Sequence, residues 1–257
     1  MNQLINYTLH LADTTLIIAQ RNSEWCAHGP ILEQDIAITN ISLDLLGQSR
    51  NFYQYAAKLI NAAHAPFPLE REGGEASEDS LAYLRTEREF KNLLITELPN
   101  GDWAQTILRQ FFFSVYQYGL YEQLHKSGDE QLAAIAEKSL KEITYHVKWS
   151  SEWVIRLGDG TEESHTRMEK AIKALWQYTG EFFIPANFEK EVFSIDYEVL
   201  KKNWQTKIET VFTEATLSIP ENVFMHTGGK TGNHTEYLGY ILAEMQHLQR
   251  TYPNAEW

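Results

Sequence analysis

The hydrophobic residues of this chain recur every three or four positions over long stretches, which is the period of one face of an α-helix. Strand-like alternation of useful length does not occur, and the 7 prolines and 14 glycines cluster at a few breaks between the periodic stretches. The pattern therefore predicts an all-α protein. The predicted helices span residues 2–26, 31–62, 78–98, 102–127, 129–157, 162–183, 196–217 and 235–251.

One predicted helix differs from the others because its middle is apolar on nearly every side. Phe111, Phe112 and Phe113 follow one another there, which predicts a central helix that other helices cover. Several helices can then meet around a common axis. Helical spacing places six residues at similar depth on the faces that point toward this axis: Thr15, Leu45, Gln48, Ser114, Ile143 and His146.

These six inward positions bear on one kind of chemistry. A di-iron carboxylate centre in a helical bundle uses four carboxylates and two histidines, with Glu-x-x-His on each of two helices. Only His146 is a ligand type among the six, so the sequence predicts a bundle without a di-iron site. The alternative interpretation is that Thr15, Gln48, Ser114 and His146 are ordinary buried polar groups that bond to one another or to water.

A metal site built from residues outside the six inward positions is a further alternative. Glu142 lies four residues before His146 instead of three, so only a local change of register, such as a π-bulge, is expected to turn it inward. Glu122 and His125 have the Glu-x-x-His spacing, close to a helix end. A self-sufficient metalloenzyme that uses a displaced site, such as these four residues, is therefore the alternative function.

Composition and charge narrow the choice of partners. The net charge of −13 disfavours nucleic acid and anionic membranes, and no apolar run approaches the roughly 20 residues of a membrane-spanning helix. The single cysteine, Cys26, excludes an internal disulfide and fits a reducing compartment. No signal peptide is visible, and no shift of composition divides the chain. We therefore expect one cytoplasmic domain over residues 1–257.

A cluster of phenylalanines predicts a contact surface. The segment around Pro185 carries several large apolar side chains that a broken helix cannot all bury. The candidate interface residues are Phe182, Phe183, Phe188 and Phe193. The alternative is that this segment folds back over its own bundle.

Several stretches, in the same order and spread over nearly the whole chain, resemble one protein family. They are Glu24-Trp25-Cys26-Ala27-His28, the segment from Asn40 to Asn51, Lys141-Glu142 with Tyr145-His146, Gly228-Gly229-Lys230 with His234-Thr235-Glu236, and Leu242 to Gln246. On these residues the chain resembles the PaaC family, which comprises the C subunits of the bacterial phenylacetyl-CoA 1,2-epoxidases. These oxygenases epoxidise the aromatic ring in phenylacetate catabolism.

The resemblance implies a fold and a role. The fold would be a ferritin-like helical bundle with additional C-terminal helices. The role would be that of a non-catalytic structural subunit, a partner of the catalytic A subunit and the other subunits of an NADPH- and O2-dependent complex. The resemblance also implies that this chain carries no cofactor, because the di-iron centre, the flavin and the Fe–S cluster belong to other subunits.

The ligand motif of the A subunits can be placed on this sequence by the same resemblance. Its Asp-Glu-x-Gly-His falls on Asp44 to Gln48, so that its Glu and His become Leu45 and Gln48. Its second Glu-x-x-His falls on Ile143 to His146. The remaining carboxylate positions fall on Thr15 and Ser114.

The glycine-rich segment near the C-terminus is the last candidate for function. Lys230 lies among three glycines, and its charge suits the phosphates of an acyl-CoA, so it is a candidate CoA contact; a plain linker is the alternative. A third class of function is a helical interaction protein outside any oxygenase.

Overall fold

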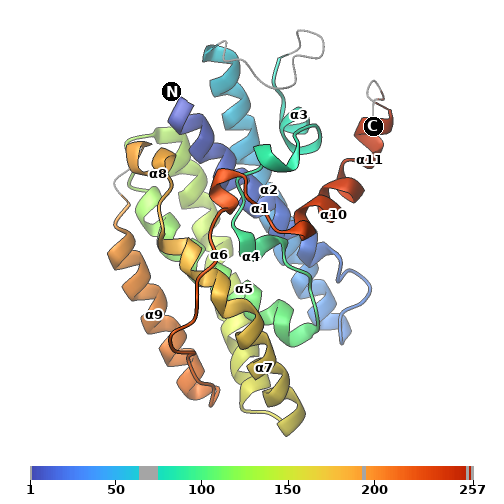
Figure 1. The fold of residues 1–257 in the computed structure, drawn as a ribbon, viewed down its shortest axis with the longest axis vertical. Coiled ribbons are helices and arrows are strands. Elements are labelled where there is room, and N and C mark those ends of the chain that lie inside the picture. The colour runs from blue at the N-terminus through green and yellow to red at the C-terminus, as the bar shows by residue number, and fades with distance from the viewer. Residues whose placement is uncertain (1, 64–74, 193–194, 253–254, 256–257) are drawn as a thin grey trace.

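Four long helices form the body of the molecule (Figure 1). The computed structural model describes residues 2–63, 75–192, 195–252 and 255, and these contain helices and loops but no strand. The long helices are α1 (Asn2–Ser23), α2 (Leu32–Ala63), α5 (Trp103–Leu124) and α6 (Glu130–Gly158). Contacts join α1 to α2, α2 to α6 and α5 to α6. This arrangement confirms the predicted all-α, ferritin-like bundle.

The shorter elements cover the sides and one end of the bundle. They are α3 (Glu78–Tyr83), η1 (Glu87–Glu89), α4 (Leu94–Glu97), α7 (Glu162–Leu175), η2 (Trp176–Phe183), α8 (Asn187–Val192), α9 (Tyr197–Glu214), η3 (Gly229–Thr231), α10 (Glu236–Met245) and α11 (His247–Thr251). Helices α7 and α9 pack against α5, and α8 packs against α1. The two last helices lie on the opposite side of the bundle from α9 (Figure 1).

The predicted continuous helix over 78–98 is wrong. A capping box at Ser77 begins α3, but the helix ends at Tyr83. The Nε of Arg85 donates a 2.6 Å hydrogen bond to the carbonyl of Leu81, which a continued helix would use for a backbone bond. Beyond this point the backbone N–H of Lys91 donates to a carboxylate oxygen of Asp13 at 2.8 Å. Long-range bonds to α1 therefore replace helical ones.

Other parts of the helix prediction also differ from the structure. The predicted helix over 162–183 changes to 3₁₀ geometry at Trp176. The short helix α8 and the 3₁₀ turn η3 had no counterpart among the predicted helices. The predicted helix over 235–251 divides into α10 and α11.

The central position predicted for α5 is confirmed. Phe111, Phe112 and Phe113 are all buried, and the ring of Phe112 lies 5.7 Å from that of Trp176 and 5.6 Å from that of Trp204. Each of these large aromatic side chains removes apolar surface from water, which is the main term that stabilises such a bundle. The core is thus continuous from α5 to η2 and α9.

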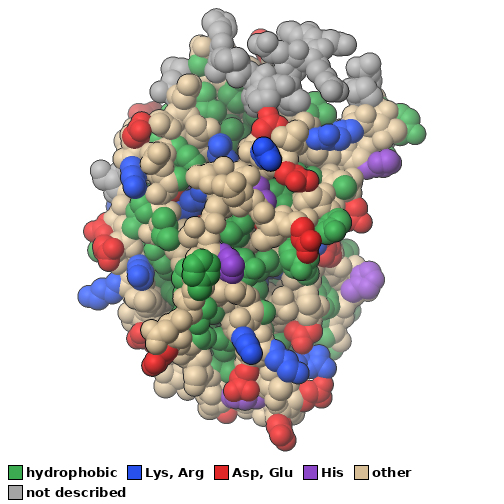
Figure 2. All heavy atoms as spheres, in the orientation of Figure 1, with side chains coloured by type: hydrophobic (Ala, Val, Ile, Leu, Met, Phe, Trp, Pro, Cys, Tyr) green, Lys and Arg blue, Asp and Glu red, His purple; other side chains and the backbone are tan. Residues whose placement is uncertain are grey.

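The surface carries charges of both signs. Figure 2 shows acidic and basic side chains interspersed over the face that it draws, with hydrophobic side chains between them. A single-sign field of the kind that attracts a nucleic acid is not seen on this face. Among the described residues, no helix is both long enough and apolar enough to cross a membrane.

Candidate functional site

The six inward positions are buried, as the sequence predicted. Each of them is at most 2% exposed. Thr15 lies on α1, Leu45 and Gln48 on α2, Ser114 on α5, and Ile143 and His146 on α6. The helices of the bundle therefore point these side chains into the interior.

A chain of amides and one carboxylate crosses the interior at Gln48. Its Nε2 donates to an oxygen of Glu142 at 2.8 Å, and its Oε1 accepts from Nε2 of Gln117 at 3.0 Å. Helix α6 is a regular α-helix at this point, so Glu142 lies half-buried at the edge of the stripe, and its carboxylate reaches Gln48 from there. The result is a hydrogen-bonded link among α2, α5 and α6.

His146 has a different partner. Its Nε2 donates to Oδ2 of Asp44 at 3.0 Å, and Asp44 is partly exposed at the surface of α2. The Nδ1 of His146 is buried and bonds to none of the described residues. The imidazole thus lies between α6 and α2 and points toward the edge of the bundle.

The two hydroxyl positions are also satisfied by hydrogen bonds. Thr15 donates to the carbonyl of Leu11 in its own helix at 2.8 Å. Ser114 accepts from Nε2 of Gln110 at 2.8 Å, and Oε1 of Gln110 accepts from Asn22 at 2.6 Å. These bonds join α1 to α5 and match the interpretation of the inward polar residues as structural groups.

The displaced metal site finds no support in the geometry. In the part of the chain that the structure describes, no three His, Cys, Asp or Glu side chains lie together in a way that would hold a metal ion. Glu122 is exposed, Glu142 bonds to Gln48, and His146 bonds to Asp44. These residues do not converge on one point.

The phenylalanine cluster is mostly part of the core, so the predicted contact surface is wrong at Phe182 and Phe188. The ring of Phe182 is buried and stacks on Tyr116 with 4.5 Å between centroids. Phe188 is 6% exposed, and its ring lies 5.8 Å from that of His10. Phe183 is partly buried and lies edge-on to Trp204 at 5.5 Å. Phe193 lies outside the described residues.

The candidate CoA contact, Lys230, is buried and paired within the chain. Its side chain is 4% exposed, and Nζ donates to both carboxylate oxygens of Glu189 at 3.1 and 3.0 Å and to the carbonyl of Ile184 at 3.1 Å. Burial raises the pKa of Glu189, but the positive charges of Lys230 and His10 lower this pKa by more. The pKa of Glu189 therefore lies below its ordinary value. The lysine holds the C-terminal segment against the bundle.

Two more buried carboxylates hold the same segment, which we call the C-terminal strap (residues 226–235). Glu181 accepts from the backbone N–H groups of Gly228 and Gly229 at 2.9 and 2.8 Å, and from that of Leu94 at 2.7 Å. Glu97 accepts from Nδ1 of His234 at 2.9 Å. Carboxylates that are distant in the sequence therefore fix the position of the strap on the bundle.

Neither carboxylate is among the predicted site residues, although the sequence contains a signal for both. Glu97 lies between Leu93-Leu94-Ile95-Thr96 and Leu98, and Glu181 directly precedes Phe182-Phe183, so each acid is next to a cluster of apolar residues. A charged residue in such a run is almost never buried without a partner. The sequence could thus have predicted that both carboxylates are buried and paired. It could not have predicted which segment they pair with.

His234 carries two protons in this arrangement. Its Nδ1 donates to Glu97, and its Nε2 donates to the carbonyl of Phe90 at 2.9 Å, so both ring nitrogens act as donors. Burial lowers the pKa of His234, but the hydrogen bond and charge of Glu97 raise it more, so that it lies above its ordinary value. The protonated imidazole links the strap to η1 and α4.

This pair predicts that part of the stability is lost as the pH rises. Because the pKa of His234 is higher in the folded chain than the unfolded value of about 6.5, its stabilisation is complete below that pH and is lost as the pH rises through the folded value. The difference in unfolding free energy between wild type and His234→Gln should therefore shrink as the pH rises above about 6.5.

Denaturant unfolding of both chains at a series of pH values measures this difference. His247→Gln is the matched control, because His247 is exposed on α11, and its difference from wild type should be small at every pH. A difference for His234→Gln that stays constant or grows with pH would contradict the charged assignment.

Comparison with known proteins gives a consistent result. The chain matches the family model described as "Phenylacetic acid catabolic protein" over residues 1–257. It is 46% identical over 261 residues to the C subunit of the 1,2-phenylacetyl-CoA epoxidase of Escherichia coli (strain K12), with 100% of both chains covered. These matches confirm the resemblance that the sequence motifs indicated.

Proposed function

Because this chain belongs to the phenylacetic acid catabolic protein family, we propose that it is the structural C subunit of a phenylacetyl-CoA 1,2-epoxidase complex. Its partners are a catalytic A subunit that carries the di-iron centre and the other subunits that supply electrons from NADPH. The chain itself catalyses no step alone. Its role is to support the catalytic subunit in phenylacetate catabolism.

The observation that carries this proposal is the chemistry of the six inward positions. Leu45 and Ile143 have no atom that can bind a metal ion, and Thr15 uses its hydroxyl within its own helix. Gln48 and Ser114 are held by neighbouring amides. The residues do not fit a di-iron group, because its four carboxylates are absent from these positions. We therefore assign iron, flavin and Fe–S chemistry to the other subunits.

The outer face of α2 is the surface that best fits the partner. Leu32, Ile36, Leu43 and Leu46 repeat at helical spacing, and all are exposed, Leu32 and Leu43 to 72% and 60%. The opposite face of α2 packs in the core, so this helix is apolar on two sides. Such a helix is normally covered on both sides, and the relative is named as one subunit of an epoxidase. We assign this stripe to the catalytic subunit.

Charge on this stripe should break the complex. Ile36→Glu combined with Leu43→Glu should weaken association with a co-expressed catalytic subunit at least about tenfold, because central apolar anchors contribute about 2 kcal/mol or more each. Co-purification on a tagged catalytic subunit, followed by a titration of the purified chains, measures the effect. Both residues are exposed, so helicity and thermal stability of the free chain should not change.

Phe224→Glu is the matched control. Phe224 is 76% exposed, but it lies in the segment after α9 and not on α2. It should co-purify at the wild-type yield. Full association of the α2 variant would contradict the assigned surface. Failure of the wild-type chain to bind any catalytic subunit would instead favour a helical interaction protein outside an oxygenase.

A further inference from the structure

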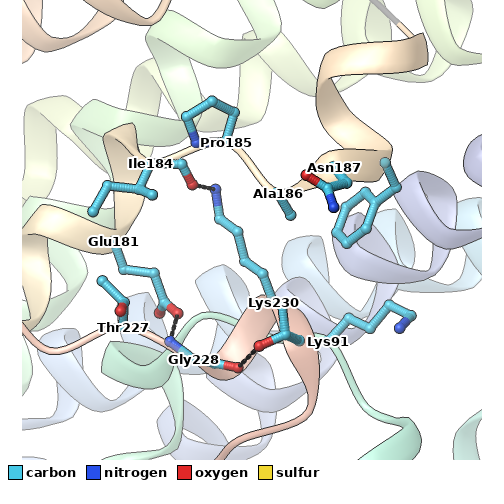
Figure 3. Close-up of a pocket in the computed structure, with 11 residues that line it drawn as sticks. Lys91, Glu181, Ile184, Pro185, Ala186, Asn187, Thr227, Gly228 and Lys230 are labelled. Atoms are coloured by element: carbon cyan, nitrogen blue, oxygen red, sulfur yellow. Dashed lines mark hydrogen bonds between the residues drawn. The ribbon is translucent and has the colours of Figure 1, made fainter.

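A pocket of about 510 Å³ opens beside the C-terminal strap. One wall is the connection from η2 to α8, which includes Ile184 and Pro185, and another is the strap itself (Figure 3). The side chain of Lys230 extends along the pocket toward the carbonyl of Ile184 (Figure 3). None of the six inward positions contributes to the lining, so this pocket is separate from the bundle axis.

The charged groups at the inner end of the pocket are already paired. Lys230 forms its ion pair with Glu189. The carboxylate of Glu181 accepts three backbone N–H groups, two of them from the strap. Burial raises the pKa of Glu181, although these N–H groups and Lys230 lower it in part. A polyanion would bring more negative charge beside these carboxylates than the remaining cation of the lining can neutralise, so a polyanion does not suit the pocket.

Lys91 is the exception among the charged lining groups. Its side chain is half-buried, and its ammonium makes no hydrogen bond or ion pair with any described residue. It lies 5.9 Å from the ring centroid of Phe188, which is also in the lining. Burial lowers the pKa of Lys91, and Arg85 lowers it as well; the charge of Asp13 opposes this shift only in part, because Asp13 already pairs with Arg85.

The remaining lining is largely apolar. Ile184, Pro185, Ala186 and Phe188 contribute its apolar part, and Asn187, Thr227 and Thr231 add polar side chains. Ile184 is 51% exposed although it is a large aliphatic residue. An apolar wall next to one unpaired cation is the arrangement that holds an organic monoanion, with its charge at the cation and its body against the wall.

We propose that this pocket binds a small organic monoanion with an apolar body, whose carboxylate pairs with Lys91. The body then contacts Ile184 and the ring of Phe188. This inference does not depend on the role of the chain as an epoxidase subunit. Phenylacetate is the natural probe, because it has one carboxylate and one ring and gives the family its name.

Titration calorimetry of the full-length chain tests the proposal. Phenylacetate should bind with a saturable isotherm. Phenylacetamide has nearly the same shape without the charge, and inorganic phosphate has charge without an apolar body, so each should bind at least about tenfold more weakly. This difference corresponds to the loss of one charge-assisted hydrogen bond in the first case and of the apolar contacts in the second.

Substitutions locate the site. Lys91→Gln should weaken phenylacetate binding at least about tenfold, whereas Lys91→Arg should retain most of it. Lys190→Gln is the matched control, because Lys190 is exposed on the neighbouring helix α8 and lies outside the pocket lining. Ile184→Asp, which changes an exposed residue of the wall, should abolish binding while the chain stays folded.

Three outcomes would overturn the proposal. They are the absence of saturable phenylacetate binding to a folded wild-type chain, equal affinity for phenylacetamide or phosphate, and an equal loss of affinity in Lys190→Gln and Lys91→Gln. None of them bears on association with a catalytic subunit, which is measured separately. Failure of the pocket and failure of the proposed function can therefore be told apart.

Discussion

Replacing Asp13 with alanine is expected to lower the free energy of unfolding by about 3–5 kcal/mol, the largest effect of any single truncation considered for this chain. Asp13 and Arg85 are both fully buried and form an ion pair, in which Nη1 of Arg85 also donates to the carbonyl of Glu89 at 2.9 Å. Asp13 further accepts from the hydroxyl of Tyr53 at 2.6 Å. Its removal leaves a buried guanidinium without a counter-charge. Denaturant unfolding at neutral pH measures the loss.

Two further variants separate lost charge from lost packing. Asp13→Ala combined with Arg85→Met should be less destabilised than Asp13→Ala alone, because no unpaired charge is then buried. Asp79→Ala, on the exposed face of α3, should change the unfolding free energy by less than about 0.5 kcal/mol. If the double variant is the less stable one, the cost of Asp13→Ala does not come from the stranded guanidinium.

Lys230→Glu is expected to cost more than the about 3–5 kcal/mol of a broken buried ion pair, because it places a second carboxylate against Glu189. Lys230→Met removes the charge but keeps most of the stem, so its cost should be smaller. Below about pH 4.3 the difference between wild type and Lys230→Met should narrow. The pKa of Glu189 is depressed in the folded chain, and the stability that this provides is lost as the pH falls through the folded value.

The rescue experiment uses the partner residue. Glu189→Gln in the Lys230→Met background should recover part of the lost stability, because the neutral amide can stay buried at a lower cost than an unpaired carboxylate. Unfolding curves of the two chains at pH 7 give the comparison. If Lys230→Glu unfolds at the wild-type midpoint, Lys230 is not buried against Glu189 in solution.

Local periodicity was sufficient to predict the bundle. The four long helices and the central place of α5 follow from apolar spacing and from Phe111 to Phe113, because these signals are contained within single helices. The six inward positions could be placed for the same reason, since helical geometry fixes which side chains share a face.

The parts that could not be predicted depend on pairs that are distant in the sequence. The helix predicted over 78–98 ends early because Arg85 and Lys91 bond to α1, and no local pattern encodes that contact. The pairing of Lys230 could not be predicted because its glycine-rich surroundings resemble a linker and Glu189 lies 41 residues away. Phe182 looked exposed near Pro185, although Tyr116 of α5 covers it.

The central claim is that this chain supports a di-iron catalytic subunit without holding iron itself, and iron analysis of the separated subunits tests it most directly. The chain and a catalytic subunit would be co-expressed, purified together, separated, and assayed for iron and for O2-dependent epoxidation of phenylacetyl-CoA. We expect that the iron stays with the catalytic subunit and that this chain alone has no activity. A stoichiometric iron pair on this chain, with epoxidation in the absence of the catalytic subunit, would contradict it.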